Sequence, residues 1–374
     1  MARTVPRGWQ ELEIKDFLKF TPREVEKPKV KYRSLGIRSH CKGTFVREVE
    51  NPDKVMMETL YAVKKNDLIV NITFAWEGAV AIVNKSNEGA LVSHRFPTYV
   101  FDRDVAVPEF FRYLIPSKRF VYNLGVISPG GAGRNRVLDR KDFYHLQFIM
   151  PPVEEQKIFA EILSTWDRAI ETLGKLIETK VKLKKGLMQK LLTGKVRFKE
   201  FKSEQWQHVK ISELCKINYG KSQKGLPSGK YKIYGTGGVV GTTKTYLYNK
   251  PSVIIGRKGT IDTPIYIEEP FYPIDTVFYV SFKEGILPKW FYYQLRMIDL
   301  KRYNETSGVP SLNREALYKI KINIASLREQ NKISSFFSVA DRELEYLSHT
   351  FETIKKQKKG LMQKLLTGKI RVKI

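Results

Sequence analysis

The chain has 374 residues, which corresponds to two or three domains at roughly 150 residues each. Hydrophobic residues account for 42% of it, so the chain can form packed cores, and wholesale disorder is excluded. Lys and Arg number 66 against 39 Asp and Glu, and the formal net charge of +27 indicates a polyanionic partner, either nucleic acid or an anionic membrane surface.

Residues 1–150 predict a globular domain dominated by strands, because short runs rich in Val, Ile, Tyr and Phe alternate with turn residues. The most apolar run, residues 67–83, contains Asn71 and Glu77 and is too short to span a bilayer. The first residues lack the apolar run of a secretory signal peptide. These features favour nucleic acid over a membrane as the partner, and we expect a cytoplasmic location.

Residues 151–198 predict a long helix that pairs with another helix. Pro151 and Pro152 precede an acidic first turn, and Gly194 follows a basic last turn, which is typical of a helix start and a helix end. The apolar residues recur at alternating steps of three and four, the spacing of a coiled-coil seam. They are Phe159, Leu163, Trp166, Ile170, Leu173 and Ile177.

Residues 199–324 predict a second strand-rich globular domain, and residues 325–374 predict a second long helix followed by a strand. Trp206 stands near the start of this half as Trp9 does in the first. Ser326 and Glu329 form a capping-box pattern at the helix start. The helix seam consists of Ile333, Phe337, Ala340, Leu344, Leu347, Phe351 and Ile354.

The two halves of the chain are an internal repeat. The string KKGLMQKLLTGK occurs at residues 184–195 and again, identically, at residues 358–369. At the same offset, Leu138-Asp139-Arg140 corresponds to Leu312-Asn313-Arg314, and Glu155-Gln156 corresponds to Glu329-Gln330. Elsewhere the globular segments differ greatly, so we expect dissimilar globules on matching helices.

After each repeated string, basic and apolar residues alternate, which predicts a short strand. The first such stretch leads into the second globule, whereas residues 369–374 have no following domain. If the halves are related by a pseudo-two-fold axis, residues 369–374 occupy the equivalent place on the first globule. We therefore expect them to pack beside the segment from Trp9 to Ile14.

This organisation resembles the specificity (S) subunits of type I restriction–modification systems. The residues that carry the resemblance are the two LMQKLLTGK helix ends, the helix starts at residues 152–156 and 327–330, and the paired globules. It implies an α+β fold in which two strand-rich globular target-recognition domains are separated by two long helices forming an antiparallel coiled coil, with internal pseudo-two-fold symmetry. The segments are then recognition domains at 1–150 and 199–324, a spacer helix at 151–198, and a spacer helix with a C-terminal strand at 325–374.

The same resemblance implies the function. Each recognition domain reads one half of a split double-stranded DNA target. The helices set the gap between the halves and dock two DNA adenine methyltransferase subunits, and restriction or translocase subunits can join the complex. A rigid pair of helices turns a fixed distance between recognition domains into a fixed spacing along the duplex.

Motifs for catalysis, cofactors and metals are not found. No phosphate-binding loop has the required spacing, and the five His residues are scattered without metal-ligand spacing. Cys41 and Cys215 cannot form a four-ligand zinc site. The sequence therefore predicts a non-catalytic subunit that holds no cofactor and no metal.

Candidate DNA-binding residues in the second globule are basic and aromatic side chains among closely spaced glycines, which allow tight loops and close approach to phosphates. They are Lys221, Lys224, Lys230, Tyr231, Tyr234, Thr236, Lys244, Arg257 and Lys258. The alternative is hairpins with solvated lysines. The helix lysines Lys182, Lys184, Lys185, Lys355, Lys356, Lys358 and Lys359 form either a solvated face or a surface toward DNA or an acidic partner.

Further candidates lie in the first globule, where the alternative for Trp76 is a place in the core. They are Arg33, Arg38, Lys42, Trp76, His94, Arg95, Arg134, Asn135 and Arg136. Two other functions remain open on the residues alone. One is a helical scaffold that organises protein partners and binds nucleic acid only non-specifically, and the other is a free-standing methyltransferase or nuclease, which the missing motifs disfavour.

Overall fold

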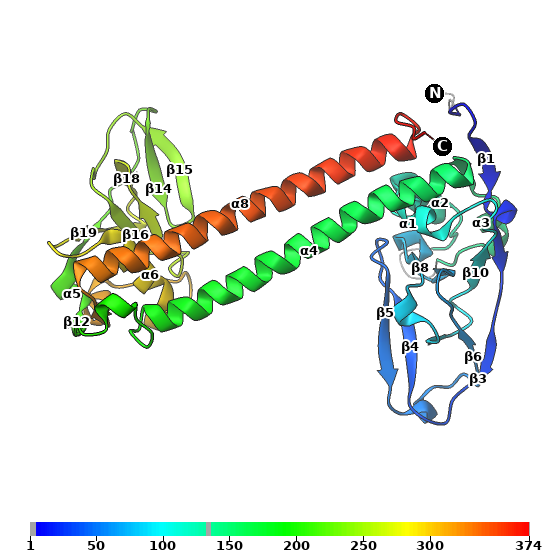
Figure 1. The fold of residues 1–374 in the computed structure, drawn as a ribbon, viewed down its shortest axis with the longest axis horizontal. Helices are drawn as coiled ribbons and strands as arrows, with labels where there is room; N and C mark the ends of the chain where they lie inside the picture. The colour runs from blue at the N-terminus through cyan, green and yellow to red at the C-terminus, as the bar shows by residue number, and fades with distance from the viewer. Residues whose placement is uncertain (1–4, 132–135, 374) are drawn as a thin grey trace. The chain divides into compact units, whose positions relative to one another are not determined.

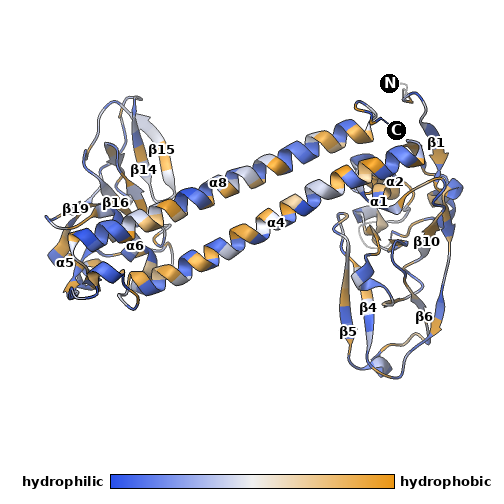
Figure 2. Ribbon diagram, in the orientation of Figure 1, coloured by the Kyte–Doolittle hydropathy of each residue, from blue (hydrophilic) through white to orange (hydrophobic). Residues whose placement is uncertain are grey.

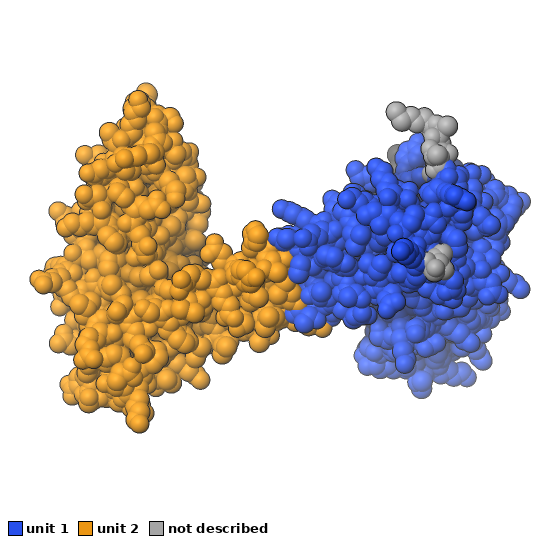
Figure 3. Space-filling model, turned by 45° about the horizontal axis from the view of Figure 1, so that its top comes forward, with its two compact units in different colours: residues 1–172, 352–374 blue, residues 173–351 orange. Residues whose placement is uncertain are grey.

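The computed structural model describes residues 5–131 and 136–373 (Figure 1). The chain forms two compact units, shown in separate colours in Figure 3. Unit 1 comprises residues 1–172 and 352–374, and unit 2 comprises residues 173–351. The two long helices, α4 (Val153–Leu191) and α8 (Leu327–Leu366), each contribute one part to each unit.

The globular part of unit 1 is built on a four-stranded sheet with the strand order β2-β10-β7-β8 and a separate strand pair, β1-β11. The strands of this scaffold are β1 (Gln10–Glu13), β2 (Leu18–Phe20), β7 (Leu68–Val70), β8 (Val80–Ile82), β10 (Thr98–Phe101) and β11 (Gln147–Met150). Its helices are α1 (Pro108–Leu114), α2 (Lys118–Val126) and α3 (Arg140–Tyr144).

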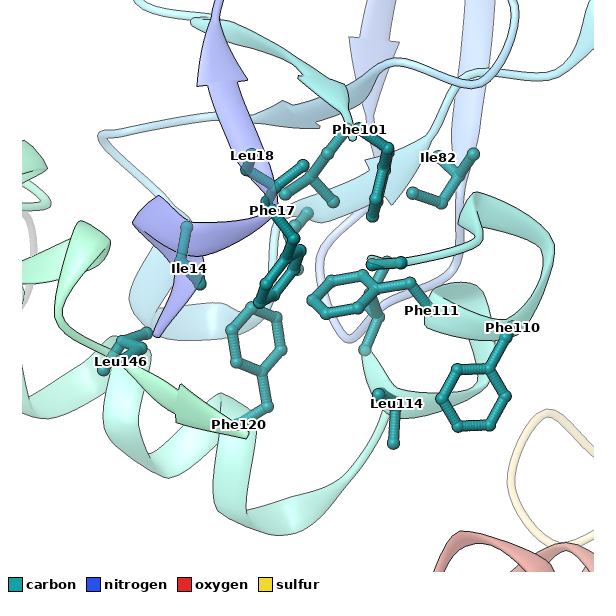
Figure 4. Packing of buried hydrophobic residues seen from close by; sticks show 14 of the residues in the cluster. Ile14, Phe17, Leu18, Ile82, Phe101, Phe110, Phe111, Leu114, Phe120 and Leu146 are labelled. Carbon is teal, nitrogen blue, oxygen red and sulfur yellow. The ribbon is translucent and has the colours of Figure 1, made fainter. Parts of the chain in front are cut away.

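Aromatic rings from separate elements form the core of unit 1. The ring centroid of Phe111, on α1, lies 5.5 Å from that of Phe17 and 5.4 Å from that of Phe101. Phe120, on α2, joins the same cluster, and Figure 4 shows these side chains converging between the sheet and the helices. Buried aromatic contacts of this kind supply much of the apolar burial that holds such a core together.

A second sheet in unit 1 is inserted between the strands of the scaffold. It has the order β3-β6-β9-β4-β5, and all its neighbours except β4 and β9 pair antiparallel. Its strands are β3 (Glu24–Glu26), β4 (Tyr32–Ile37), β5 (Thr44–Val49), β6 (Thr59–Ala62) and β9 (Leu91–Val92).

Unit 2 has the same scaffold. Its four-stranded sheet has the order β13-β19-β16-β17, and its separate strand pair is β12-β20. The strands are β12 (Gln207–Lys210), β13 (Cys215–Tyr219), β16 (Ser252–Gly256), β17 (Ile265–Ile267), β19 (Val277–Phe282) and β20 (Lys321–Ile324). The helices are α5 (Ile211–Leu214), α6 (Pro288–Met297) and α7 (Arg314–Lys319).

The insertion in unit 2 is smaller and different. It is a three-stranded sheet, β15-β14-β18, made of β14 (Tyr231–Gly235), β15 (Gly238–Thr243) and β18 (Phe271–Pro273). Short 3-10 turns complete both units: η1 (Ile14–Asp16), η2 (Pro52–Lys54), η3 (Ala75–Glu77), η4 (Lys85–Asn87), η5 (Lys199–Phe201) and η6 (Leu300–Tyr303). The globules, which differ greatly in sequence, therefore share the scaffold that the predicted pseudo-two-fold symmetry requires and differ in the inserted sheets, since strands tolerate many apolar sequences.

The two long helices pair antiparallel. In unit 2, Lys180 forms an ion pair with Glu343 at 2.6 Å, and Lys184, further along α4, forms one with Asp341, which is earlier in α8. The apolar residues at the ends of the helix seam are buried in the globular cores. Phe159 and Leu163 of α4 lie in the core of unit 1, and residues of α8 lie in the core of unit 2. Figure 2 shows apolar and polar residues interleaved along both helices, as a two-helix seam requires.

A Tyr–Asp–Lys group fixes the globular part of each unit on the helix pair. In unit 1, the Tyr113 hydroxyl, on α1, donates to Asp167 Oδ2 at 2.8 Å, and Lys358 Nζ, on α8, lies 2.5 Å from Asp167 Oδ1. The Lys358 ammonium is also 5.3 Å from the centre of the Tyr113 ring. The same group recurs in unit 2, formed by Tyr293, Asp341 and Lys184.

The stretches after the helices are not strands in the part of the chain that the structure describes, which corrects the sequence interpretation. The Val196 N–H donates to the Lys190 carbonyl at 3.1 Å, and the Ile370 N–H donates to the Lys364 carbonyl at 3.2 Å. Both Gly194 and Gly368 have positive φ, at 73° and 69°, which turns the chain back on the helix end. A backbone donor used in this turn is not available to a sheet.

The expected location of the C-terminal stretch is nevertheless confirmed. Arg371 donates two hydrogen bonds to Glu155, at 2.6 and 2.8 Å, and one to the Arg7 carbonyl at 2.7 Å. The Trp9 indole N–H donates to the same Glu155 carboxylate at 3.1 Å. Unit 2 repeats this cluster with Trp206, Glu329 and Arg197.

Candidate nucleic-acid interface

Two glycines in unit 2 allow loops to pass close to neighbouring backbone. A Cβ at Gly220 would lie 2.0 Å from the Ile274 carbonyl oxygen, and one at Gly256 would lie 2.0 Å from that of Thr260. No other residue fits either position, because real Cβ contacts are never so short. Each glycine immediately precedes a candidate, Lys221 or Arg257, so the scaffold fixes where these two basic residues leave the sheet.

Arg257 lies in a cluster of arginine and tyrosine side chains. Its guanidinium carbon is 5.2 Å from the centre of the Tyr219 ring, and its Nη1 donates to the Asp275 carbonyl at 3.0 Å. The guanidinium of Arg314 lies 5.1 Å from the same ring. Tyr219 ends β13, the edge strand of the four-stranded sheet, and is 46% exposed, so this cluster faces solvent.

Two more candidates gather beside Arg257. The Lys258 backbone pairs with Ser311 in an isolated bridge, and the Gly259 N–H donates to the Pro310 carbonyl at 2.8 Å. The Thr236 hydroxyl lies 3.6 Å from the position of a Cβ at Gly259. Thr236, Arg257 and Lys258 therefore come from two loops that meet, and a third loop, around residue 310, closes the group.

A second group lies at the open end of the β14-β15 hairpin. Lys230 Nζ is 4.9 Å from the centre of the Tyr231 ring, which packs edge-on against Tyr246 at 5.1 Å. Tyr231 pairs with Thr243, so Lys244, the residue after Thr243, lies at the same end of the hairpin. The Lys244 N–H donates to the Pro227 carbonyl at 3.0 Å.

The remaining candidates of unit 2 are placed differently. Lys221 and Lys224 are exposed in the loop between β13 and β14. Tyr234 packs against Phe271 in a small core, with ring centroids 6.0 Å apart, and burial raises the pKa of its hydroxyl. Its position fits packing of the inserted sheet rather than contact with a ligand.

Three candidates of unit 1 meet around the loop that contains η3. The Arg136 guanidinium is 5.3 Å from the centre of the Trp76 ring and donates to the Ser128 carbonyl at 2.9 Å. The Trp76 indole N–H donates to the Thr73 carbonyl at 3.2 Å, and Arg95 Nη1 donates to the Thr73 hydroxyl at 3.5 Å. Trp76 is half-buried and part of this surface cluster rather than of the main core.

The turn of the β4-β5 hairpin lies against the same loop. The His40 N–H donates to the Glu77 carbonyl at 2.7 Å, and the Cys41 N–H donates to the Gly78 carbonyl at 2.9 Å. This contact brings the exposed Lys42 beside Trp76's loop. Arg38, at the base of the turn, packs on Phe45 at 5.0 Å.

Two candidates of unit 1 stand apart from this cluster, and two cannot be placed. Arg33, on β4, donates to the Ser86 carbonyl at 2.5 Å. His94 is exposed and lines a small cavity together with Arg140. Arg134 and Asn135 lie outside the described residues.

The sequence interpretation missed Tyr219, Arg140 and Arg314 as surface side chains of interest. A signal existed for the two arginines, because they occupy matched positions in the repeated Leu-x-Arg strings. The helix lysines Lys184 and Lys358 form ion pairs with Asp, whereas within residues 5–131 and 136–373 none of the site residues predicted in the two globules forms an ion pair with Asp or Glu. Their positive charge is therefore uncompensated, which favours a polyanionic ligand.

The described residues contain no group of three or more His, Cys, Asp or Glu side chains that could hold a metal ion. Among the helices that the structure describes, none is both long and apolar enough to cross a bilayer.

Known proteins match this chain over nearly its whole length. Residues 6–181 and 203–356 match the family model described as type I restriction modification DNA specificity domain. The chain is 27% identical over 412 residues to the type I restriction enzyme MjaVIII specificity subunit of Methanocaldococcus jannaschii, covering 99% of this chain and 94% of that protein.

Solved structures show the same fold. The S subunit of the type I restriction–modification system from M. genitalium superposes with a TM-score of 0.63 at 20% identity, covering 96% of both chains. A chain from a structure on complex assembly and conformational transition of the type I R-M system superposes with a TM-score of 0.55 at 15% identity, covering 99% of this chain and 100% of that one. The family match, on both halves of the repeat, shows that the chain belongs to the family of type I restriction–modification DNA specificity subunits.

Proposed function

We propose that this chain is the sequence-specific DNA-recognition subunit of a type I restriction–modification complex and that each unit reads one half of a bipartite target. The observation that carries the proposal is a shared scaffold that bears two different inserted sheets and two different basic loop clusters. A common scaffold suits a common mode of docking on DNA, and different loops suit different base sequences.

The chemistry of the loops supports this assignment. Arginine presents a planar fork that can bind guanine in the major groove, whereas lysine is suited to phosphate oxygens. In unit 2, Arg257 is held beside Tyr219 while Lys221 and Lys224 project from the adjoining loop. In unit 1, Lys42, Trp76, Arg95 and Arg136 occupy adjoining loops. Within each unit we propose that these residues form the DNA interface.

We further propose the roles of the remaining segments. Residues 1–150 and 199–324 are the two target-recognition domains, and the segments 151–198 and 325–374 contain the spacer helices. The helices set the gap between the half-sites and dock two adenine methyltransferase subunits, and restriction or translocase subunits join the assembly. Support comes from the antiparallel helix pairing seen in unit 2 and from the likeness to a structure concerned with assembly of the type I R-M system. A cytoplasmic location follows from this role.

We also propose that the chain is not itself an enzyme and supplies neither cofactor nor metal to the reaction. Incubating the purified chain alone with S-adenosylmethionine and DNA tests this point. We expect no methyl transfer until methyltransferase subunits are added, and methylation by the chain alone would overturn it.

Mapping methylated adenines in DNA treated with the reconstituted complex tests the main proposal. We expect two dissimilar short half-sites separated by a fixed number of unspecified bases. Half-sites centred about one helical turn apart, ~34 Å, would lie on one face of the duplex. A single continuous target, or tolerance of any gap length, would contradict it. DNA affinity that does not depend on sequence would favour a helical scaffold with non-specific binding.

A further inference from the structure

The same arginine position is present on the scaffold of both units. Arg140 is the first residue of α3, and Arg314 is the first residue of α7. Each follows a helix-capping residue, Asp139 or Asn313, whose side chain accepts backbone N–H groups of the first turn. The backbone that presents both arginines is therefore fixed in the same way.

Equivalent backbone contacts hold both arginines to the scaffold. The N–H of Leu138 donates to the Ile72 carbonyl at 2.9 Å, and the N–H of Leu312 donates to the Arg257 carbonyl at 2.9 Å. Both leucines are 3% exposed. Each arginine thus stands two residues after a buried anchor and next to the loop that carries the other candidates of its unit.

An aromatic ring from the first strand of the four-stranded sheet supports each guanidinium. In unit 1 the Arg140 guanidinium carbon is 4.1 Å from the centre of the Phe20 ring, at the end of β2. In unit 2 the Arg314 guanidinium is 5.1 Å from the centre of the Tyr219 ring, at the end of β13. An aromatic face restrains the guanidinium but leaves the N–H groups in its plane able to bind a ligand.

Neither arginine is neutralised by a distant acid. Arg140 is exposed and forms no ion pair within the described residues. Among the residues that the structure describes, Arg314 forms an ion pair only with its neighbour Glu315, whose carboxylate lies 3.4 Å from Nε and whose side chain is 63% exposed. An exposed ion pair between adjacent residues is weak and does not prevent the guanidinium from binding a stronger anion.

We propose that Arg140 and Arg314 are paired phosphate anchors, one in each unit, that bind the DNA backbone independently of base sequence. The inserted sheets differ between the units and suit half-sites of different sequence, whereas this position is shared. A contact common to two different half-sites must recognise what they have in common, which is the sugar–phosphate backbone. A guanidinium fork binds two phosphate oxygens at once. The assignment rests on the proposed function of DNA recognition.

Four variants of the full chain test the proposal: Arg140→Ala, Arg314→Ala, and the lysine variants at both positions. Dissociation constants are measured on the cognate duplex and on random duplex across a range of salt concentrations. We expect each alanine variant to lose roughly tenfold in affinity on both duplexes and to lower the salt slope by about one. The lysine variants should recover the salt slope and only part of the affinity, since they keep the charge and lose the fork.

Arg296→Ala is the matched control. This arginine also lies over a tyrosine, Tyr292, at 6.0 Å, but it is exposed on α6. We expect the control to bind both duplexes like the unsubstituted chain. Thermal unfolding of every variant confirms that the fold is intact.

Phosphate ethylation interference gives a readout that a structural defect would not move. One backbone position in each half-site should lose its interference signal in the corresponding alanine variant and keep it in the other. A changed base preference in either half-site, or losses no larger than those of Arg296→Ala, would overturn the proposal. If the unsubstituted chain shows no sequence preference, the proposed function of sequence-specific DNA recognition is wrong. The phosphate-anchor proposal is then decided by the affinities of the alanine variants for random duplex.

Discussion

Arg371 donates two hydrogen bonds to Glu155, a carboxylate that is 0% exposed in unit 1. The two residues are 216 positions apart, and the contact raises the pKa of the Arg371 guanidinium. Arg197 and Glu329 form the same pair in unit 2. A buried carboxylate is costly unless it is paired, so each globular part depends on the segment that follows the long helix packed against it.

Replacing Arg371 by Ala should therefore destabilise unit 1. The substitution leaves the buried Glu155 carboxylate with the Trp9 indole as its side-chain donor. We expect a loss of about 2–3 kcal/mol in the free energy of unfolding. This is at or below the lower end for a broken buried ion pair, because Arg371 is itself 37% exposed. Chemical denaturation followed by fluorescence measures this loss. Lys373→Ala, an exposed residue in the same stretch, is the control, and equal melting of the two variants would contradict the expectation.

The Tyr–Asp–Lys groups should contribute less, because Asp167 is 48% exposed. We expect Tyr113→Phe and Lys358→Ala each to cost about 0.5–1.5 kcal/mol and to be coupled through Asp167. A double-mutant cycle with the two substitutions measures that coupling. The exposed neighbour Lys359 supplies the control, since Lys359→Ala should show no coupling to Tyr113→Phe, and strict additivity of the test pair would rule out a shared contact.

Arg257→Ala should weaken binding to cognate DNA more than binding to random DNA. A bidentate contact between arginine and guanine is worth about 1–3 kcal/mol of discrimination. Lys224→Ala should weaken both to the same extent, because an exposed loop lysine is suited to phosphate. Competition binding on the two duplexes separates these outcomes. Equal losses for Arg257→Ala on both duplexes would show that Arg257 does not read bases.

Stability should fall at high pH. Burial raises the pKa of the Cys215 thiol from 9.0 to about 12, so the folded state holds this proton more tightly than the unfolded state does. The resulting stabilisation is complete below about pH 9 and is lost as the pH rises toward 12. Unfolding free energies measured from pH 8 to 11 should decline less steeply for Cys215→Ala than for the unsubstituted chain. Parallel pH profiles would show that Cys215 makes no contribution.

Features that depend on local spacing could be predicted from the sequence. The long helices follow from the three-and-four spacing of Phe159 and Leu163 and from the glycines after each last turn, and the structure places them accordingly. The repeated Glu-Gln pair could also be seen in the sequence, but its structural role could not. Gln156 is buried and binds the backbone of Val105 and Val107 in the globular part, a contact between distant residues that no local pattern reveals.

The surface clusters depend on contacts between distant loops, and sequence alone located them only in part. Arg257 could be singled out, but its contact with Tyr219 joins residues 38 positions apart and requires the β13-β19-β16 order. The predicted strand after Gly368 failed for a related reason. Alternating residues suit a strand, yet the Ile370 N–H is already engaged by the helix end.

Both inserted sheets enter the scaffold at the same two connections. In unit 1 they lie between β2 and β7 and between β8 and β10, and in unit 2 they lie between β13 and β16 and between β17 and β19. A new inserted sheet grafted there would keep the scaffold, the buried clusters and the paired helices unchanged. If each unit reads one half-site, as proposed above, a graft in one unit would rewrite that half-site and leave the loops of the other unit unchanged.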